Sequence, residues 1–137
     1  MRKLHSLIIA IALTASSVSC GSESISGLQT LAAQLNGTWA EVVNIPGVST
    51  VVTLVVTDTI ISGTGAYTIE AGRPGTFTAS GVIAGTQIRF DLVRSDGFTE
   101  HFQGTLPSAN VLTGISWFTS ASIHGDPTTI SFRRTGT

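Results

Sequence analysis

Residues 76–93, with the sequence TFTASGVIAGTQIRFDLV, predict a β-hairpin, and this stretch decides the fold. We expect its turn at residues 84–87, because glycine at the first central position suits a type II′ turn, whose twist matches that of the strands. Side chains alternate between the two faces of a strand, so this turn places Ile83 opposite Ile88 and Gly81 opposite Phe90. An aromatic ring that covers a strand glycine in this way helps to fix the register.

Strand-like segments at short, regular intervals occupy the rest of the chain. They are residues 35–43, 51–58, 60–69, 98–106, 111–118 and 128–134, and the alternation is ambiguous in 111–118. Eight consecutive strands with short links predict an all-β, eight-stranded antiparallel up-and-down barrel. The long links fall on alternate connections, which would place loops at one end of the barrel and tight turns at the other. A two-sheet sandwich is the alternative architecture.

A short N-terminal helix is expected just before the first strand. Leu28, Leu31 and Leu35 recur at helical spacing, and Ser26 with Gln29 fits a capping box. We therefore predict one or two helical turns over residues 28–34.

The first 19 residues have the features of a secretory signal. Arg2 and Lys3 precede an apolar run at residues 7–13, which is too short to span a bilayer. The next residues, Ser17-Val18-Ser19-Cys20, resemble the lipobox of bacterial lipoproteins, whose cysteine is lipidated and becomes the mature N-terminus. The rival interpretation is an ordinary signal peptide that happens to contain a cysteine.

The lone cysteine and the residues after it support the lipoprotein interpretation. Cys20 is the only cysteine, and a free thiol in an oxidising compartment would be a liability. Gly21 and Ser22 follow it, with no Asp that would resemble an inner-membrane retention signal. The expected location is therefore the bacterial cell envelope, lipid-anchored at the outer membrane. The chain divides into a signal peptide (1–19), a tether (20–27) and a barrel domain (28–137).

Charge excludes one class of partner. After loss of Arg2 and Lys3 the chain keeps five arginines and all eight acidic residues, so its net charge is 5 − 8 = −3. The sequence has no cluster of basic residues that would attract the phosphate backbone of a nucleic acid. We therefore expect no nucleic-acid partner.

We also expect the protein to be a monomer.

The order of motifs resembles that of the lipocalins and their calycin relatives. Those proteins begin with a short helix and a Gly-x-Trp motif on the first strand, and an arginine on the last strand packs across the tryptophan. Here the motif is Gly37-Thr38-Trp39, and Arg134 is the better candidate of the final arginine pair because it shares a face with Phe132. The resemblance implies a small barrel that binds hydrophobic molecules, although this chain is short for the family.

The sequence contains few residues that could serve in catalysis or metal binding. His101 is expected on the outward face of its strand and His124 in a loop, and both are interpreted as solvated. Only Asp126 lies at a ligand-like spacing from His124. We therefore predict no enzyme activity, no metal and no cofactor.

Three charged residues are predicted on the inward face near the loop-bearing end: Glu41, Arg94 and Glu100. They would form a polar collar at the mouth of an apolar cavity, able to orient a ligand's polar head. The alternative is a structural Arg94–Glu100 ion pair at the rim, with Glu41 merely solvated. The predicted ligand-binding residues are Glu41, Ile45, Val48, Tyr67, Phe77, Phe90, Arg94 and Glu100.

The sequence does not decide whether the inward aromatic residues fill the barrel or leave a cavity in it. A barrel of eight strands is just wide enough to be filled by side chains or to hold one small ligand. The first hypothesis is therefore a membrane-anchored barrel that binds a small hydrophobic or amphipathic ligand. The second is a filled-core module that meets a protein partner at the cell envelope.

Overall fold

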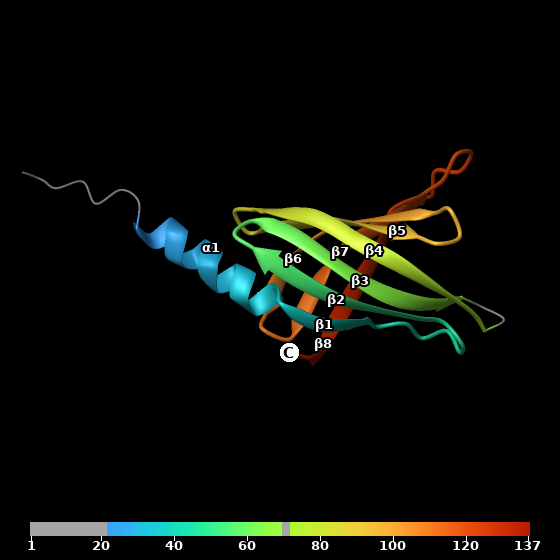
Figure 1. The fold of residues 1–137 in the computed structure, drawn as a ribbon, viewed down its shortest axis with the longest axis horizontal. Coiled ribbons are helices and arrows are strands. Elements are labelled where there is room, and N and C mark those ends of the chain that lie inside the picture. The colour runs from blue at the N-terminus through green and yellow to red at the C-terminus, as the bar shows by residue number, and fades with distance from the viewer. Residues whose placement is uncertain (1–21, 70–71) are drawn as a thin grey trace, which may run out of the picture.

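The computed structural model describes residues 22–69 and 72–137, and it has one helix followed by eight strands (Figure 1). The predicted signal peptide, Cys20 and Gly21 lie outside the described residues. The elements are α1 (Ser22–Leu35), β1 (Gly37–Glu41), β2 (Ser49–Thr57), β3 (Ile60–Ile69), β4 (Arg73–Ala84), β5 (Gln87–Arg94), β6 (Thr99–Ser108), β7 (Val111–Thr119) and β8 (Thr128–Gly136).

The strands pair in sequence order and close into an antiparallel up-and-down barrel, which confirms the predicted fold. The hairpin register is also confirmed, because Ile83 pairs with Ile88 and Gly81 pairs with Phe90. Gly85 has φ = 62°, which fits the expected turn. Sequence alternation thus positions the strands correctly, with small errors at their ends.

The helix is longer than predicted. It has 14 residues and begins at Ser22, so most of the stretch interpreted as a tether is helical. The serines and glycine of that stretch have low helix propensity, but propensity is a weak guide once one turn is fixed by packing. Ala32 and Leu35 are buried in the core, with Leu28 and Leu31 packed against it, and this contact fixes the helix.

The two ends of the barrel differ as predicted. The tight turns at 58–59, 85–86 and 109–110 lie on the same side as α1, and the links at 42–48, 95–98 and 120–127 lie at the opposite end (Figure 1). We call this second end the mouth. β3 ends at Ile69 and β4 begins at Arg73 at this same end, so fewer residues join these two strands than we expected.

The barrel interior is occupied by aromatic side chains. Phe90 stacks on Phe102 with 4.6 Å between ring centroids, and Phe132 packs edge-on against Phe102 at 5.8 Å. Other rings lie against inward glycines: a Cβ atom on Gly65 would collide with Phe77, and one on Gly75 with Tyr67. The space that the glycines leave is therefore taken by neighbouring rings, and the core is filled to this extent.

Trp39 and Arg134 pack together at the end of the barrel next to α1, and we call this pair the clasp. Trp39 is fully buried and its Nε1–H donates to the carbonyl oxygen of Leu35 at 2.9 Å. The guanidinium carbon of Arg134 lies 4.5 Å from the Trp39 ring centroid, and its nitrogens donate to the carbonyl oxygens of Asn36 (2.5 Å) and Ala109 (3.0 Å). Arg134 therefore joins the helix end, the first strand and the β6–β7 turn.

Gly37 belongs to the same clasp. Its φ is 128°, a conformation that other residues rarely adopt, and a Cβ atom there would lie 2.5 Å from Arg134 Nη1. Glycine two residues before Trp39 is thus required by backbone geometry and by the arginine.

We expect Arg134→Lys to destabilise the fold by about 1–3 kcal/mol, because lysine can neither stack flat on Trp39 nor reach two carbonyl groups at once. Arg133→Lys is the matched control, since Arg133 is exposed one position away and should change stability by less than about 0.5 kcal/mol. Urea unfolding of both variants measures the difference. Equal stabilities would show that the clasp contributes nothing beyond positive charge.

Candidate ligand site at the barrel mouth

Arg94, the last residue of β5, lies across the mouth between two aromatic rings. Its guanidinium carbon is 3.8 Å from the ring centroid of Tyr67 and 5.5 Å from that of Phe118. Its Nη2 and Nε donate to the two carboxylate oxygens of Asp96 at 2.7 and 3.2 Å. The Arg94 side chain is 12% exposed and the Asp96 side chain 32%, so the guanidinium is largely buried while the carboxylate is partly open to water.

Asp96 is fixed by the turn in which it lies. Its Oδ1 also accepts the backbone N–H of Phe98 at 3.3 Å, the local bond that Asp commonly makes in turns. Burial by itself would raise the pKa of Asp96, but hydrogen bonds from Arg94, Phe98 and Tyr67 outweigh it, and the pKa is lowered. Asp96 is therefore a carboxylate at neutral pH and holds Arg94 in place.

A pocket of about 330 Å³ opens beside this ion pair. Its lining combines three apolar side chains with the pair itself: Ile69, Phe98, Phe118, Arg94 and Asp96. The volume is at the small end of the range for small-molecule sites. The pocket thus offers an apolar wall and one hydrogen-bonding ion pair to a visiting molecule.

Glu100 lies below the mouth, inside the barrel. It is 4% exposed, and Ser116 hydrogen-bonds to its carboxylate. Burial and the nearby charge of Glu41 raise the pKa of Glu100 to about 7, although the Ser116 hydroxyl and Arg94 act in the opposite direction. Glu100 therefore changes charge near neutral pH, in contrast to Asp96 above it.

The structure brings some of the predicted site residues together and separates others. Arg94 lines the mouth pocket and Tyr67 lies directly under it, whereas Phe77 and Phe90 are core residues. Glu41 is half-buried, so it is not simply solvated. Ile45 is 55% exposed and Val48 half-buried, and neither lines the mouth pocket.

Two sequence interpretations need correction. The alternative interpretation places Arg94 in an ion pair with Glu100, but Arg94 pairs with Asp96, because the tight β5–β6 turn returns Asp96 toward the arginine. His101 was interpreted as solvated, but it is half-buried and its ring nitrogens contact Asp91 and Thr119 at 2.7 and 2.8 Å. His124 is exposed in its loop as expected.

Sequence reasoning missed Asp96, Phe118 and Ser116. The sequence Ser95-Asp96-Gly97 is a turn signal, and an Asp in such a turn could have been placed near the arginine just before it. Phe118 and Ser116 lie on β7, where both faces carry apolar residues and the alternation gives no clear inward face. The structure shows that Leu112 and Ser116 point inward and Ile115 is exposed.

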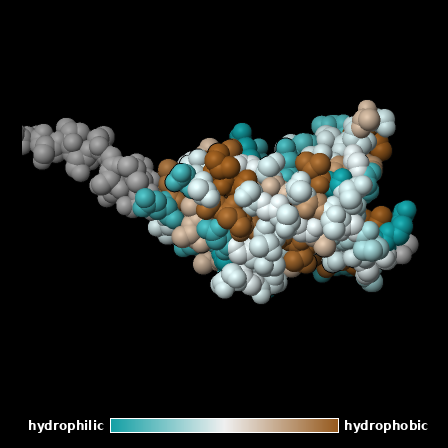
Figure 2. Space-filling model, viewed as in Figure 1, coloured by the Kyte–Doolittle hydropathy of each residue, from teal (hydrophilic) through white to brown (hydrophobic). Residues whose placement is uncertain are grey.

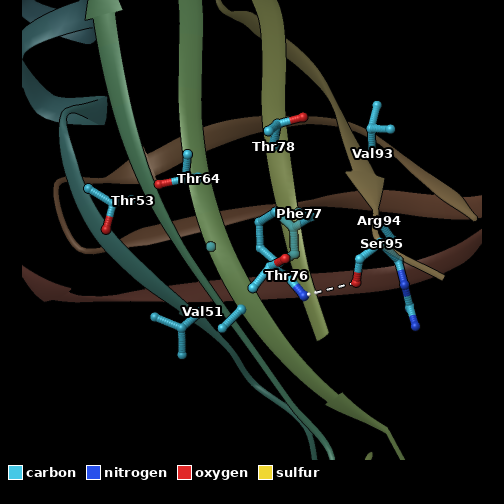
Figure 3. A pocket seen from close by; sticks show the side chains of 11 residues that line it. Val51, Thr53, Thr64, Thr76, Phe77, Thr78, Val93, Arg94 and Ser95 are labelled. Atoms are coloured by element: carbon cyan, nitrogen blue, oxygen red, sulfur yellow. Dashed lines mark hydrogen bonds between the residues drawn. The ribbon is translucent and has the colours of Figure 1, made fainter. Parts of the chain in front are cut away.

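A hollow of about 700 Å³ lies on the outer face of β2–β5. Figure 3 shows Thr53, Thr64 and Thr78 around it, with the backbone N–H of Thr76 donating to Ser95 Oγ at 3.2 Å. The middle of this face is mostly pale with brown patches in Figure 2, as expected for threonine, serine and valine. Its lining consists mostly of hydroxyl and methyl groups, and Arg94 is the one charged residue in it.

Within residues 22–69 and 72–137, no group of three or more His, Cys, Asp or Glu side chains is arranged to hold a metal ion. In the same residues, no helix is both long and apolar enough to cross a membrane.

Glu100 should make stability fall as pH rises. Its folded pKa of about 7 exceeds the ordinary value of 4.5, so the folded state binds the proton more tightly and loses this advantage between pH 4.5 and 7. The free energy of unfolding should drop by about 2–3 kcal/mol between pH 5 and pH 8. In the Glu100→Gln variant this decrease in the free energy of unfolding should nearly vanish. Urea unfolding of both proteins at several pH values measures the difference.

Glu41→Gln is the control for this prediction. Removing the neighbouring charge should lower the pKa of Glu100 and move the transition to lower pH without abolishing it. An unchanged pH profile in Glu100→Gln would assign the titration to a different group.

Comparison with known proteins supports the fold. No protein-family description matches the chain, and no curated protein matches it in sequence. Among solved structures, EF1p2_mFAP2b bound to DFHBI superimposes with a TM-score of 0.60 at 14% sequence identity, over 79% of this chain and 99% of that one. At this identity the likeness shows a shared eight-stranded antiparallel barrel.

Proposed function

We propose that this protein binds a small hydrophobic or amphipathic molecule at the mouth of its barrel. The observation that carries the proposal is the ion pair of Arg94 and Asp96, held among aromatic rings at the edge of an apolar pocket. The pair keeps its donors and acceptors in fixed positions, and the partly exposed carboxylate can be reached by a ligand's head group. The similar barrel EF1p2_mFAP2b has been solved bound to DFHBI, which shows that a barrel of this shape can hold a ligand.

The filled interior determines how such a ligand would lie. Because Phe77 and Tyr67 occupy the space over Gly65 and Gly75, the apolar part of the ligand would rest against Phe98 and Phe118 at the rim. Its polar head would reach the Arg94–Asp96 pair, where both a donor and an acceptor are present. Deep entry along the barrel axis would require the rings to move.

The test is a thermal-shift screen of single-chain amphiphiles with hydroxyl, carboxylate or amine heads. A ligand that binds only the folded state raises Tm with concentration. Arg94→Gln should change the order of preference among head groups, whereas Phe98→Ala should weaken binding of all of them. Arg89→Gln is the matched control, because Arg89 is exposed on the outer face of the same strand.

If no amphiphile raises Tm in the wild-type protein, the ligand-binding proposal fails. The second candidate function, a filled-core module that meets a protein partner, would then be favoured. Its support is the filled interior together with the nearly uncharged outer hollow. Thr64→Arg in the lining of that hollow should abolish capture of a partner from the cell envelope, whereas Phe98→Ala, which changes the mouth pocket only, should not.

Lipid attachment at Cys20 is a separate proposal that rests on sequence alone. It would tether the helix end of the barrel to the outer membrane and leave the mouth facing away, because α1 and the mouth lie at opposite ends. Labelling cells with a clickable fatty acid should tag the wild-type protein. Cys20→Ser should lose the tag and leave the protein uncleaved or soluble. An unlabelled wild-type protein would contradict the proposal.

A further inference from the structure

His101 is held at both ring nitrogens on the outer face of the barrel. Strand register places Asp91, His101 and Trp117 side by side on β5, β6 and β7. His101 Nδ1 lies 2.7 Å from Asp91 Oδ1, and His101 Nε2 lies 2.8 Å from Thr119 Oγ1. A carboxylate only accepts, so Nδ1 carries the hydrogen, and in the neutral imidazole Nε2 accepts the Thr119 hydroxyl.

Trp117 stacks on this fixed imidazole, with 5.2 Å between ring centroids and 24° between ring planes. A half-buried tryptophan on a sheet surface would usually have some rotamer freedom. Here its partner is fastened by two short hydrogen bonds, so the indole is held as a flat wall. Preorganisation of this kind lowers the entropic cost of stacking a ligand.

A pocket of about 330 Å³ adjoins the indole. Its lining is Gln103, Ile115, Trp117, His124 and Pro127. The last two come from the β7–β8 loop, which is fastened to the strand end by a bridge from Thr119 to His124 and by the Gly125 N–H donating to the Phe118 carbonyl oxygen at 2.7 Å. The pocket is thus built from a sheet face and a tied loop, apart from the mouth.

The order Asp91, His101, Thr119 resembles a nucleophile triad, but acyl transfer also needs donors for the oxyanion. The Ser120 and Gly125 N–H groups, which flank this part of the loop, donate to the Ile123 and Phe118 carbonyl oxygens. We therefore assign the hydrogen bonds of His101 to positioning Trp117.

We propose that this pocket binds a neutral saccharide, with one sugar ring stacked on Trp117. The C–H face of a pyranose fits an indole ring, and Ile115 and Pro127 extend the apolar wall. The amide of Gln103 and the imidazole of His124 supply donors and acceptors for hydroxyl groups at the rim. Asp91 is engaged by His101 and does not line the pocket, so the lining offers no carboxylate for a cationic ligand.

The probes are neutral disaccharides: maltose, cellobiose, lactose and N,N′-diacetylchitobiose. Trp117 and the fully buried Trp39 are the two tryptophans of the chain, so a saturable change in tryptophan emission would report on Trp117. Saturation-transfer NMR gives a second readout that does not depend on the fluorophore. At least one disaccharide should produce both signals with the wild-type protein.

Trp117→Ala should raise the dissociation constant of the disaccharide, measured by NMR, at least about tenfold, as for an aromatic residue at the centre of a site. His101→Leu should weaken it by a smaller factor, because the indole loses its fixed support, and His101→Phe should restore part of the loss by stacking. Phe98→Ala at the mouth is the matched control and should leave saccharide binding unchanged. Circular dichroism checks that each variant is folded.

Absence of both signals with all four disaccharides would overturn the proposal. Unchanged NMR binding in Trp117→Ala would also overturn it, because the sugar would then bind elsewhere. If the pocket instead takes a planar aromatic such as indole in a Trp117-dependent way and rejects every disaccharide, the assignment to saccharide is wrong.

Discussion

The barrel closes where β1 pairs with β8, and the side chain of Arg134 braces this seam. The first strand, β1, has only five residues and must pair with both β2 and β8. Arg134 stacks on Trp39 and donates to carbonyl oxygens on either side of the seam, at Asn36 and Ala109. Asn36 continues the connection, because its Oδ1 accepts the Val56 N–H at 2.7 Å. Helix, first strand and last strand are thus fixed by one planar cation and one amide, and the helix end of the barrel is sealed.

The two acids near the mouth lie at different depths. Rings pack against glycines in the barrel interior, Asp96 lies at the rim, and Glu100 is buried just below it. There the two acids behave differently: Asp96 has a guanidinium and a backbone N–H as partners, whereas Glu100 has a serine hydroxyl and a neighbouring carboxylate. Environment alone therefore separates a permanent carboxylate from one that titrates near neutral pH.

The fold could be predicted from sequence because the hairpin at 76–93 has one consistent alternation and a turn residue that fixes its register. The contact of Arg134 with Trp39 was expected from a resemblance of motifs and not from periodicity, and the structure brings both residues together with Gly37. The mouth was harder to predict. Arg94 was placed correctly on its strand, but its partner depends on a turn conformation that periodicity does not encode. On β7 the exposed Ile115 and the buried Ser116 reverse the usual pattern, so the inward face could not be chosen.

The reversed pattern on β7 has a structural consequence for the two pockets. Trp117 lies on the outer face against His101, while its neighbour Phe118 lines the mouth beside Arg94. The carbonyl oxygen of Phe118 accepts the Gly125 N–H, which ties the loop carrying His124 and Pro127 to the same residue. The side chain of Phe118 thus belongs to the mouth pocket, and its backbone carbonyl group belongs to the support of the outer pocket. Any coupling between the two sites would be reciprocal, so a molecule in the outer pocket would change affinity at the mouth by the same factor.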